Sequence, residues 1–366
     1  MSEPLKNMYN AQFFEQLCPV LKDVVQDFSE RRFVYRIFDS IWPELELKQR
    51  TRKVTLALAE CLPSDYPKAI EMVVAICQSL QKVKDRFPTY PLIFLPDYIE
   101  IYGLDHFDLS MKAIEESTKL VSAEFAIRPF IKRYPIEAMG TMLKWSKHSH
   151  PAVRRLSSEG CRPRLPWGMG IPRLKNDPSP ILPILENLKT DPSDSVRRSV
   201  ANNLNDIAKD HPDCALALAV KWRGVNPETD WIIKHGCRTL LKRGHPAVLS
   251  LHGFSPKARM KIKDLVVPKE VRLGNALTFQ FVFVNKEKRT AHYRIDYALD
   301  YLTRSGKTSR KIFKLSERAV GPGEEIFFTR KKSFKDFTTR KHYKGKHRLQ
   351  ILANGVEVAE QEFLAC

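Results

Sequence analysis

The sequence predicts a mostly α protein, in which a solenoid of helical repeats is followed by a small all-β sandwich. Val153-Arg154-Arg155 and Val196-Arg197-Arg198 each open a helical segment, and the two copies start 43 residues apart. This spacing lies within the roughly 40–47 residue period of two-helix HEAT-type repeats. Apolar residues then alternate with polar ones near the C-terminus, which is typical of strands. We therefore predict a HEAT-like domain over residues 1–254 and an immunoglobulin-like β-sandwich over residues 257–366.

In the N-terminal part, apolar residues recur at helical spacing. They predict helices over residues 10–25, 31–45, 47–83 (interrupted by a Pro-containing turn at 64–67), 111–130, 135–148, 150–160, 180–190, 196–210, 213–222 and 230–244. Residues 84–107 predict a long connection with a short helix, and residues 162–180 an irregular segment rich in Pro, Gly and Arg.

Three details of this part are specific enough to be checked. Placing Tyr66-Pro67 on His211-Pro212 aligns Arg52 with Arg197, so we interpret residues 47–83 as a degenerate copy of the later repeat. Ser110 is predicted to cap the helix over 111–130. A proline at position 129 is expected to end, kink or restart that helix.

The C-terminal part contains five segments with alternating polarity, separated by turn residues. They cover residues 271–285, 292–303, 307–320, 324–334 and 346–364, with turns at Asn285, Ser305-Gly306, Gly321-Pro322-Gly323 and Asn354-Gly355. Six or seven short strands within about 110 residues are expected for an immunoglobulin-like sandwich.

The charge of the chain indicates a polyanionic partner. The net charge is +19, and residues 255–366 alone carry 25 Lys and Arg against 12 Asp and Glu. Such an excess favours nucleic acid. No apolar run is long enough for a membrane helix, and the N-terminus does not resemble a signal peptide. Seven scattered cysteines indicate reduced thiols, which is typical of a cytoplasmic protein. We expect the protein to be a soluble monomer, and to be associated with the nucleoid if it is bacterial.

Three motifs carry a family resemblance: Ser122-Ala123-Glu124-Phe125-Ala126-Ile127-Arg128-Pro129, the segment from Glu159 to Trp167, and Val200-Ala201-Asn202-Asn203-Leu204-Asn205-Asp206. Together they resemble the DNA alkylation repair glycosylases of the HEAT-repeat AlkC/AlkD superfamily, and the AlkC branch most closely. The basic sandwich resembles the extension that some AlkC proteins carry. The resemblance implies base excision repair of duplex DNA. The reaction would be hydrolysis of the N-glycosidic bond of cationic bases such as 3-methyladenine and 3-methylcytosine, without base flipping.

A cationic base is already a good leaving group, so such an enzyme must stabilise an oxocarbenium-like sugar and position a water. A carboxylate does both, and no metal or other cofactor is required. Glu124 is the candidate, because it stands among small and apolar residues where a charge is costly to bury. The related AlkD branch has an Asp at this place. The alternative for Glu124 is an exposed position or an ion pair with Arg128 four residues on.

Two further residues complete the candidate catalytic set. Trp167 stands in the irregular loop, where an aromatic face would attract a cationic lesion. Its alternative is packing of the loop onto the helices. Asp206 is predicted to support Glu124 or to orient the water. Its alternative is an exposed helix residue near Lys209.

Basic residues recur at or near the starts of helices, and equivalent positions of a solenoid lie along one edge. A row of cations there would follow a DNA backbone. The candidates for DNA binding are Arg154, Arg155, Arg162, Arg164, Arg197, Arg198, Lys234 and Arg238. Arg155 is placed nearest the site. The alternative for each is a structural or solvated side chain.

The β-domain is predicted to contact DNA through clustered cations, with His342 or Tyr343 at loop tips. The clusters are Lys307 with Arg310 and Lys311, Arg330 to Lys332, and Arg340 to Lys346. The predicted function is therefore a monofunctional DNA N-glycosylase, a hydrolase. The rival hypothesis is a non-catalytic HEAT scaffold that binds nucleic acid or an acidic protein.

Overall fold

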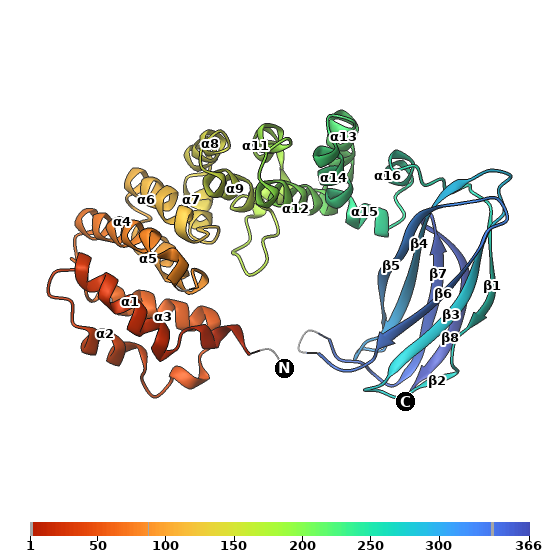
Figure 1. The fold of residues 1–366 in the computed structure, drawn as a ribbon, viewed down its shortest axis with the longest axis horizontal. Helices are drawn as coiled ribbons and strands as arrows, with labels where there is room; N and C mark the ends of the chain where they lie inside the picture. Colours follow the sequence, from red (N-terminus) through yellow and green to blue (C-terminus); the bar gives the residue numbers. More distant parts are fainter. Residues whose placement is uncertain (1–2, 87, 338–339) are drawn as a thin grey trace. The chain divides into compact units, whose positions relative to one another are not determined.

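The computed structural model describes residues 3–86, 88–337 and 340–366. Its N-terminal part is helical, as predicted (Figure 1). The α-helices are α1 (Ala11–Val24), α2 (Glu30–Ile37), α3 (Leu47–Ala59), α4 (Tyr66–Lys82), α5 (Phe94–Tyr102), α6 (Phe107–Leu120), α7 (Ile127–Arg133), α8 (Pro135–Trp145), α9 (Pro151–Glu159), α10 (Pro172–Asn176), α11 (Leu182–Leu188), α12 (Asp194–Asp210), α13 (Pro212–Trp222), α14 (Pro227–Gly236), α15 (Arg238–Lys242) and α16 (Pro246–Leu251). Short 3₁₀ turns are η1 (Leu5–Met8), η2 (Trp42–Glu44), η3 (Lys84–Arg86), η4 (Tyr90–Ile93) and η5 (Ser179–Ile181).

The helices up to α12 form two adjacent rows (Figure 1). Helix α3 packs on α5 and α9 packs on α12 in one row, and α4 packs on α6 in the other. Helix α12 buries the apolar stripe that the sequence predicts, which includes Val196, Val200, Leu204 and Ile207. In such a solenoid each repeat is stabilised mainly by its neighbours.

The Val-Arg-Arg repeat has a structural cause. Arg154 donates to the carbonyls of His148 and Ser149 at 2.9 and 2.7 Å, which lie six and five residues before it. Arg197 donates to the carbonyls of Asp191 and Pro192, both at 2.8 Å and at the same offsets. The first arginine of each copy therefore fastens the preceding loop to the start of its helix.

The predicted extents of three helices were wrong: the helix over 31–45 ends at Ile37, the one over 230–244 is divided into α14 and α15, and the one over 111–130 is interrupted. Helix α6 begins after His106 and ends at Leu120, and a turn separates it from α7. Ser110 is not the cap; it lies inside α6, where its hydroxyl donates to the carbonyl of Gly103 at 2.8 Å. Pro129 lies in the first turn of α7, so a new helix starts around it, as expected. A proline is tolerated there because the backbone N–H that it lacks would have no partner within the helix.

The C-terminal part is a two-sheet β-sandwich, which confirms the predicted fold class. One sheet has the order β1-β3-β6 and the other β2-β8-β7-β4-β5. The strands are β1 (Met260–Val266), β2 (Glu270–Val271), β3 (Ala276–Asn285), β4 (Ala291–Leu302), β5 (Thr308–Val320), β6 (Glu325–Ser333), β7 (Gly345–Ala353) and β8 (Val356–Ala365).

The sandwich core follows the predicted alternation. Phe279, Phe281 and Phe283 of β3 all point into it, with polar or partly exposed residues between them. Asn354-Gly355 forms the turn from β7 to β8 with φ of 48° and 78°, as a two-residue hairpin turn requires. The described residues of this part form eight strands rather than six or seven, because β1 precedes the first predicted segment.

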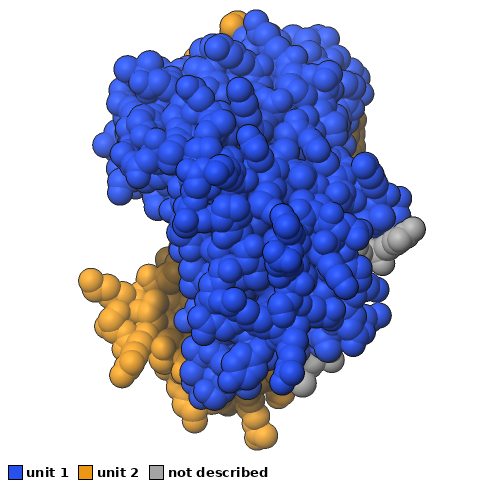
Figure 2. Space-filling view, turned by 90° about the vertical axis from the view of Figure 1, so that its left-hand side faces the viewer, with its two compact units in different colours: residues 1–210, 224–232 blue, residues 211–223, 233–366 orange. Residues whose placement is uncertain are grey.

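The chain divides into two compact units (Figure 2). One comprises residues 1–210 and 224–232, and the other comprises residues 211–223 and 233–366. The second unit thus includes α13, α15 and α16 together with the sandwich. The predicted domain boundary near residues 254–257 stays a prediction. Among the described residues, no helix has both the length and the apolar character to cross a membrane.

Candidate active site

Glu124 lies in the turn between α6 and α7, where the prediction had a helix. Its carboxylate Oε2 accepts a hydrogen bond from the Ser122 hydroxyl at 2.7 Å and another from Arg155 Nη1 at 3.0 Å. Arg155 also donates to the Ser122 hydroxyl at 2.9 Å. The Glu124 side chain is 18% exposed. Two donors from different elements therefore hold one oxygen of a half-buried carboxylate.

The alternative of a Glu124–Arg128 ion pair is wrong. The buried Arg128 guanidinium instead donates to three carbonyls, those of Gly160 at 2.8 Å, Arg162 at 3.0 Å and Met169 at 2.5 Å. Burial lowers the pKa of Arg128 to about 10. Because these carbonyls belong to the segment from Gly160 to Met169, Arg128 anchors the loop that carries the candidate tryptophan.

Trp167 stands at the tip of that loop. It has φ of +62°, a conformation that most side chains avoid, and is 62% exposed, so its indole is not a core side chain. Lys48 of α3 donates to the Trp167 carbonyl. Gly168 beside it is closely packed, since a Cβ there would lie 2.9 Å from the Leu165 side chain. The loop is thus fastened at both ends while the indole is presented to solvent.

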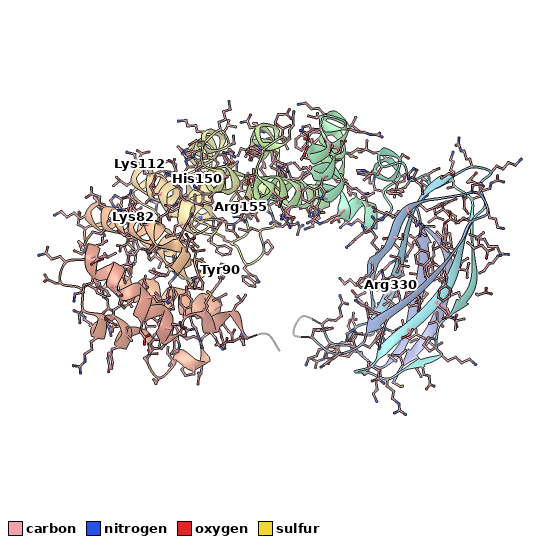
Figure 3. All side chains as sticks on the ribbon, viewed as in Figure 1. Lys82, Tyr90, Lys112, His150, Arg155 and Arg330 are labelled. Carbon is pink, nitrogen blue, oxygen red and sulfur yellow. The ribbon has the colours of Figure 1, made fainter. Side chains whose placement is uncertain are left out.

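Glu124 and Trp167 line the same cavity, of about 310 Å³. Its walls are Tyr90, Ile93, Val121, Ser122, Glu124, Phe125, Glu159, Arg162, Leu165, Pro166 and Trp167. Tyr90 and Arg155 lie on the inner side of the curve that the helices of the first unit describe (Figure 3). Burial, and after it the negative charge of Glu124, raises the pKa of Tyr90. The cavity therefore combines a carboxylate with aromatic side chains.

Asp206 is buried rather than an exposed helix residue, and it does not line this cavity. It accepts from Arg162 Nε at 2.9 Å and from Lys209 at 2.9 Å. Arg162 also donates to Glu159 at 2.6 Å, and Glu159 lies 3.9 Å from Arg155. A chain of alternating charges therefore runs from Asp206 to the arginine that holds Glu124.

Some of the candidate DNA-binding residues already bind other groups of the protein, and others are exposed. Arg154 and Arg197 hold loop carbonyls, and Arg154 also forms a two-bond ion pair with the buried Asp191. Arg162 is buried within the charge chain. Contacts of this kind favour structural roles for these three arginines.

Arg164 and Arg198 are more accessible. Arg164 pairs with Asp210 at 2.7 Å and Arg198 with Asp194 at 2.8 Å, with 39% and 63% of their side chains exposed. In the second unit, Lys234 pairs with Glu317 of β5 at 2.6 Å, and Arg238 donates to the carbonyl of His235 at 2.7 Å. Exposed ion pairs such as those of Arg164 and Arg198 contribute little to stability.

The basic clusters of the β-domain are largely at the surface. Lys307, Arg310, Lys311, Arg330 and Lys331 are exposed, and Arg330 stands on β6 (Figure 3). His342 is not available at a loop tip, because it is buried against Tyr301 and Phe334. Burial lowers the pKa of His342.

Sequence reasoning missed the contributions of Lys48, Tyr90, Ser122 and Phe125. Ser122 and Phe125 flank Glu124 in the motif, so their nearness was a usable signal. Lys48 and Tyr90 precede Glu124 by 76 and 34 residues and reach the site only through packing of α3 and η4. Among the described residues, no group of acidic, His and Cys side chains is arranged to hold a metal ion.

Comparison with known proteins adds to this geometry. Residues 261–365 match the family described as "Uncharacterised protein YhaZ, C-terminal Ig-like domain", and residues 181–211 match the HEAT repeat. A Bacillus subtilis protein, YhaZ, is 43% identical over 363 residues, 99% of both chains. The structure of Pseudomonas fluorescens alkylpurine DNA glycosylase AlkC, bound to DNA containing an abasic site analog, is similar with a TM-score of 0.92 and 35% identity, and the match covers all of both chains.

Proposed function

Because this chain belongs to the AlkC family of HEAT-repeat DNA glycosylases, we propose that it is a monofunctional DNA glycosylase of base excision repair. Its substrates are cationic alkylated bases such as 3-methyladenine and 3-methylcytosine in duplex DNA, and the base is not flipped into a pocket. The observation that carries the proposal is the Glu124 carboxylate, held by two donors in a cavity that it shares with the exposed Trp167.

Glu124 acts on the sugar. Both of its hydrogen bonds end on Oε2, and within the described residues no donor reaches Oε1. The free oxygen stabilises positive charge at C1′ as the base departs, and it accepts a proton from the attacking water. The bond from C1′ to the base breaks with its electron pair going to the base. The water oxygen then forms the new bond to C1′.

Ser122 and Arg155 orient the carboxylate, since both donate to it. Arg155 is 29% exposed, so it also reaches a phosphate next to the lesion. Asp206 acts at a distance: through Arg162 and Glu159 it fixes the position of Arg155. We therefore assign Asp206 a positioning role rather than direct contact with the sugar.

Trp167 and Tyr90 supply aromatic faces beside the carboxylate. A cationic base is attracted to such faces. The exposed Arg164 and Arg198, the cations Lys234 and Arg238, and the basic surface of the sandwich hold the DNA backbone. Arg154, Arg162 and Arg197 contribute mainly by fastening loops.

The test is the release of free methylated base from methylated duplex DNA, with wild type and Glu124→Ala side by side. We expect release by wild type, and a large loss in the variant with DNA binding retained. Unchanged release in the variant would keep the enzyme and discard Glu124. Tight, salt-dependent DNA binding with no release by wild type would favour the HEAT scaffold instead.

A further inference from the structure

A second and larger cavity, of about 450 Å³, adjoins the candidate site. It shares five wall residues with the first cavity: Tyr90, Ile93, Ser122, Phe125 and Trp167. Its other walls come from η2, α3, α5 and the segments next to them, none of which contributes a group to the reaction proposed above. The two cavities thus meet at one aromatic wall, with Glu124 on the side of the smaller one.

The larger cavity has an acidic end. Arg52 donates to both carboxylate oxygens of Asp97 at 2.9 Å, and the Thr55 hydroxyl donates to Asp97 at 2.7 Å. Glu100 has fewer polar partners than Asp97. The Arg52 guanidinium lies 3.6 Å from its carboxylate, and no described residue donates a hydrogen bond to it. Burial, and next the charge of Asp97, raises the pKa of Glu100 to about 6. A half-buried acceptor without a donor is costly unless something else binds it.

The aromatic wall of the cavity suits a planar group. The Lys48 ammonium stands over the Phe125 ring, 4.6 Å from its centre, and donates to the Trp167 carbonyl. Tyr90 and Trp167 are 41% and 62% exposed, so their rings are available for stacking. Purines and pyrimidines stack well on such faces.

The cations of this cavity already have internal partners. Arg52 is engaged by Asp97 and, at 3.6 Å, by Glu100; Lys53 is engaged by Asp39, and Lys48 by the Trp167 carbonyl. An exocyclic amino group would donate to the Glu100 carboxylate, which accepts no hydrogen bond from the described residues. The volume lies within the range of small-molecule sites, and the lining combines apolar and aromatic side chains with polar and charged ones.

We propose that this second cavity binds the excised methylated nucleobase, stacked on the Phe125 and Trp167 wall with its amino group donating to Glu100. This inference rests on the proposed glycosylase function, because only bond cleavage would supply the free base there. The base moves across the shared wall when its bond to C1′ breaks, while the sugar stays at Glu124.

The test is calorimetric titration of 3-methyladenine into the full-length protein without DNA. We expect saturable binding by wild type. Glu100→Gln and Phe125→Leu should each weaken it by about ten-fold, since each removes one favourable contact. The matched control is Glu71→Gln, an exposed glutamate on α4 outside both cavities, which should bind as wild type does. Thermal unfolding of each variant confirms that it is folded.

Three results would overturn the proposal. Absence of saturable binding by wild type would do so, as would equal binding by wild type and folded Glu100→Gln. The third is loss of binding in Glu124→Gln with no change in Glu100→Gln, because the base would then occupy the smaller cavity. The proposed function is tested separately, by measuring base release from methylated DNA. A protein that binds the free base but releases none would keep the cavity assignment and reject the activity.

Discussion

The two Val-Arg-Arg repeats place the same sequence in the same local structure but use it differently. In α9 and in α12 the first arginine donates to the carbonyls six and five residues earlier. The second arginines diverge. Arg155 reaches out of its helix to Ser122 and Glu124, whereas Arg198 pairs with Asp194 on its own helix and is 63% exposed.

This difference separates what a repeat specifies from what its neighbours add. The offset to the loop carbonyls is local, so every copy with the same sequence can reproduce it. The hydrogen-bonded partners of Arg155 come from outside its helix, because the turn between α6 and α7 places Ser122 and Glu124 within its reach. In this solenoid the candidate site therefore depends on contacts between repeats.

The largest expected effect comes from changing the acidic partners of the two second arginines, Glu124 for Arg155 and Asp194 for Arg198. Glu124→Gln should reduce base release by about 10²–10³-fold, because it removes the charge that stabilises the sugar cation. DNA affinity should hold or rise, since a negative charge is lost. Single-turnover assays with methylated duplex DNA measure both. Asp194→Asn, which removes the partner of Arg198, should leave release within about two-fold. Equal losses in the two variants would contradict the distinction.

The link between the two repeats is tested next. Asp206→Asn should lower the free energy of unfolding by about 3 kcal/mol, because it leaves the buried Arg162 with one anionic partner instead of two. Urea titration measures the change. Asp210 on the same helix provides the matched case, since its arginine partner, Arg164, is 39% exposed. Asp210→Asn should cost less than about 1 kcal/mol. A larger loss for Asp210→Asn than for Asp206→Asn would reverse our interpretation.

The first arginines of the two repeats are expected to behave alike. Arg197→Met should cost about 1 kcal/mol of unfolding free energy, for the loss of two bonds to carbonyls. Arg154→Met should cost about 2 kcal/mol, because the buried Asp191 also loses its ion pair. Both are read from thermal or urea unfolding. Base release at a temperature where both variants are folded should be nearly normal, and a selective loss in either one would assign that arginine to DNA instead.

The smallest expected effect sharpens the contrast between the second arginines. Arg155→Gln should slow release at saturating DNA by about ten-fold, because Glu124 loses one of its two donors. Arg198→Gln should leave that rate unchanged and reduce the slope of log affinity against log salt concentration by about one. Fluorescence anisotropy over a salt series measures the slope. A rate loss in Arg198→Gln, with no change of slope, would place it in the site rather than on the backbone.

Much of the fold was predictable because helix and strand periodicity are local properties. The helical part, the sandwich and its Asn354-Gly355 turn all followed from short stretches of sequence. The end of α6 was not predictable, because the apolar residues between Val121 and Ala126 suit a helix as well as a buried turn. Aligning prolines put Arg52 at the place of Arg197, yet Arg50 is the residue that donates to a carbonyl five residues earlier, that of Leu45.

The sequence by itself determined the fold class and the 43-residue repeat, because both follow from the pattern of residue types along the chain, and it nominated Glu124 through the resemblance of its motif to a known family. Only the tertiary structure decided which charges meet. It joined Glu124 to Arg155 rather than Arg128, buried Asp206 behind Arg162, and brought Lys48 and Tyr90 to the Trp167 loop. Ion pairs and cavity walls connect residues tens of positions apart, and side-chain packing, which has no signature in a local sequence pattern, selects among the many partners that charge alone would allow.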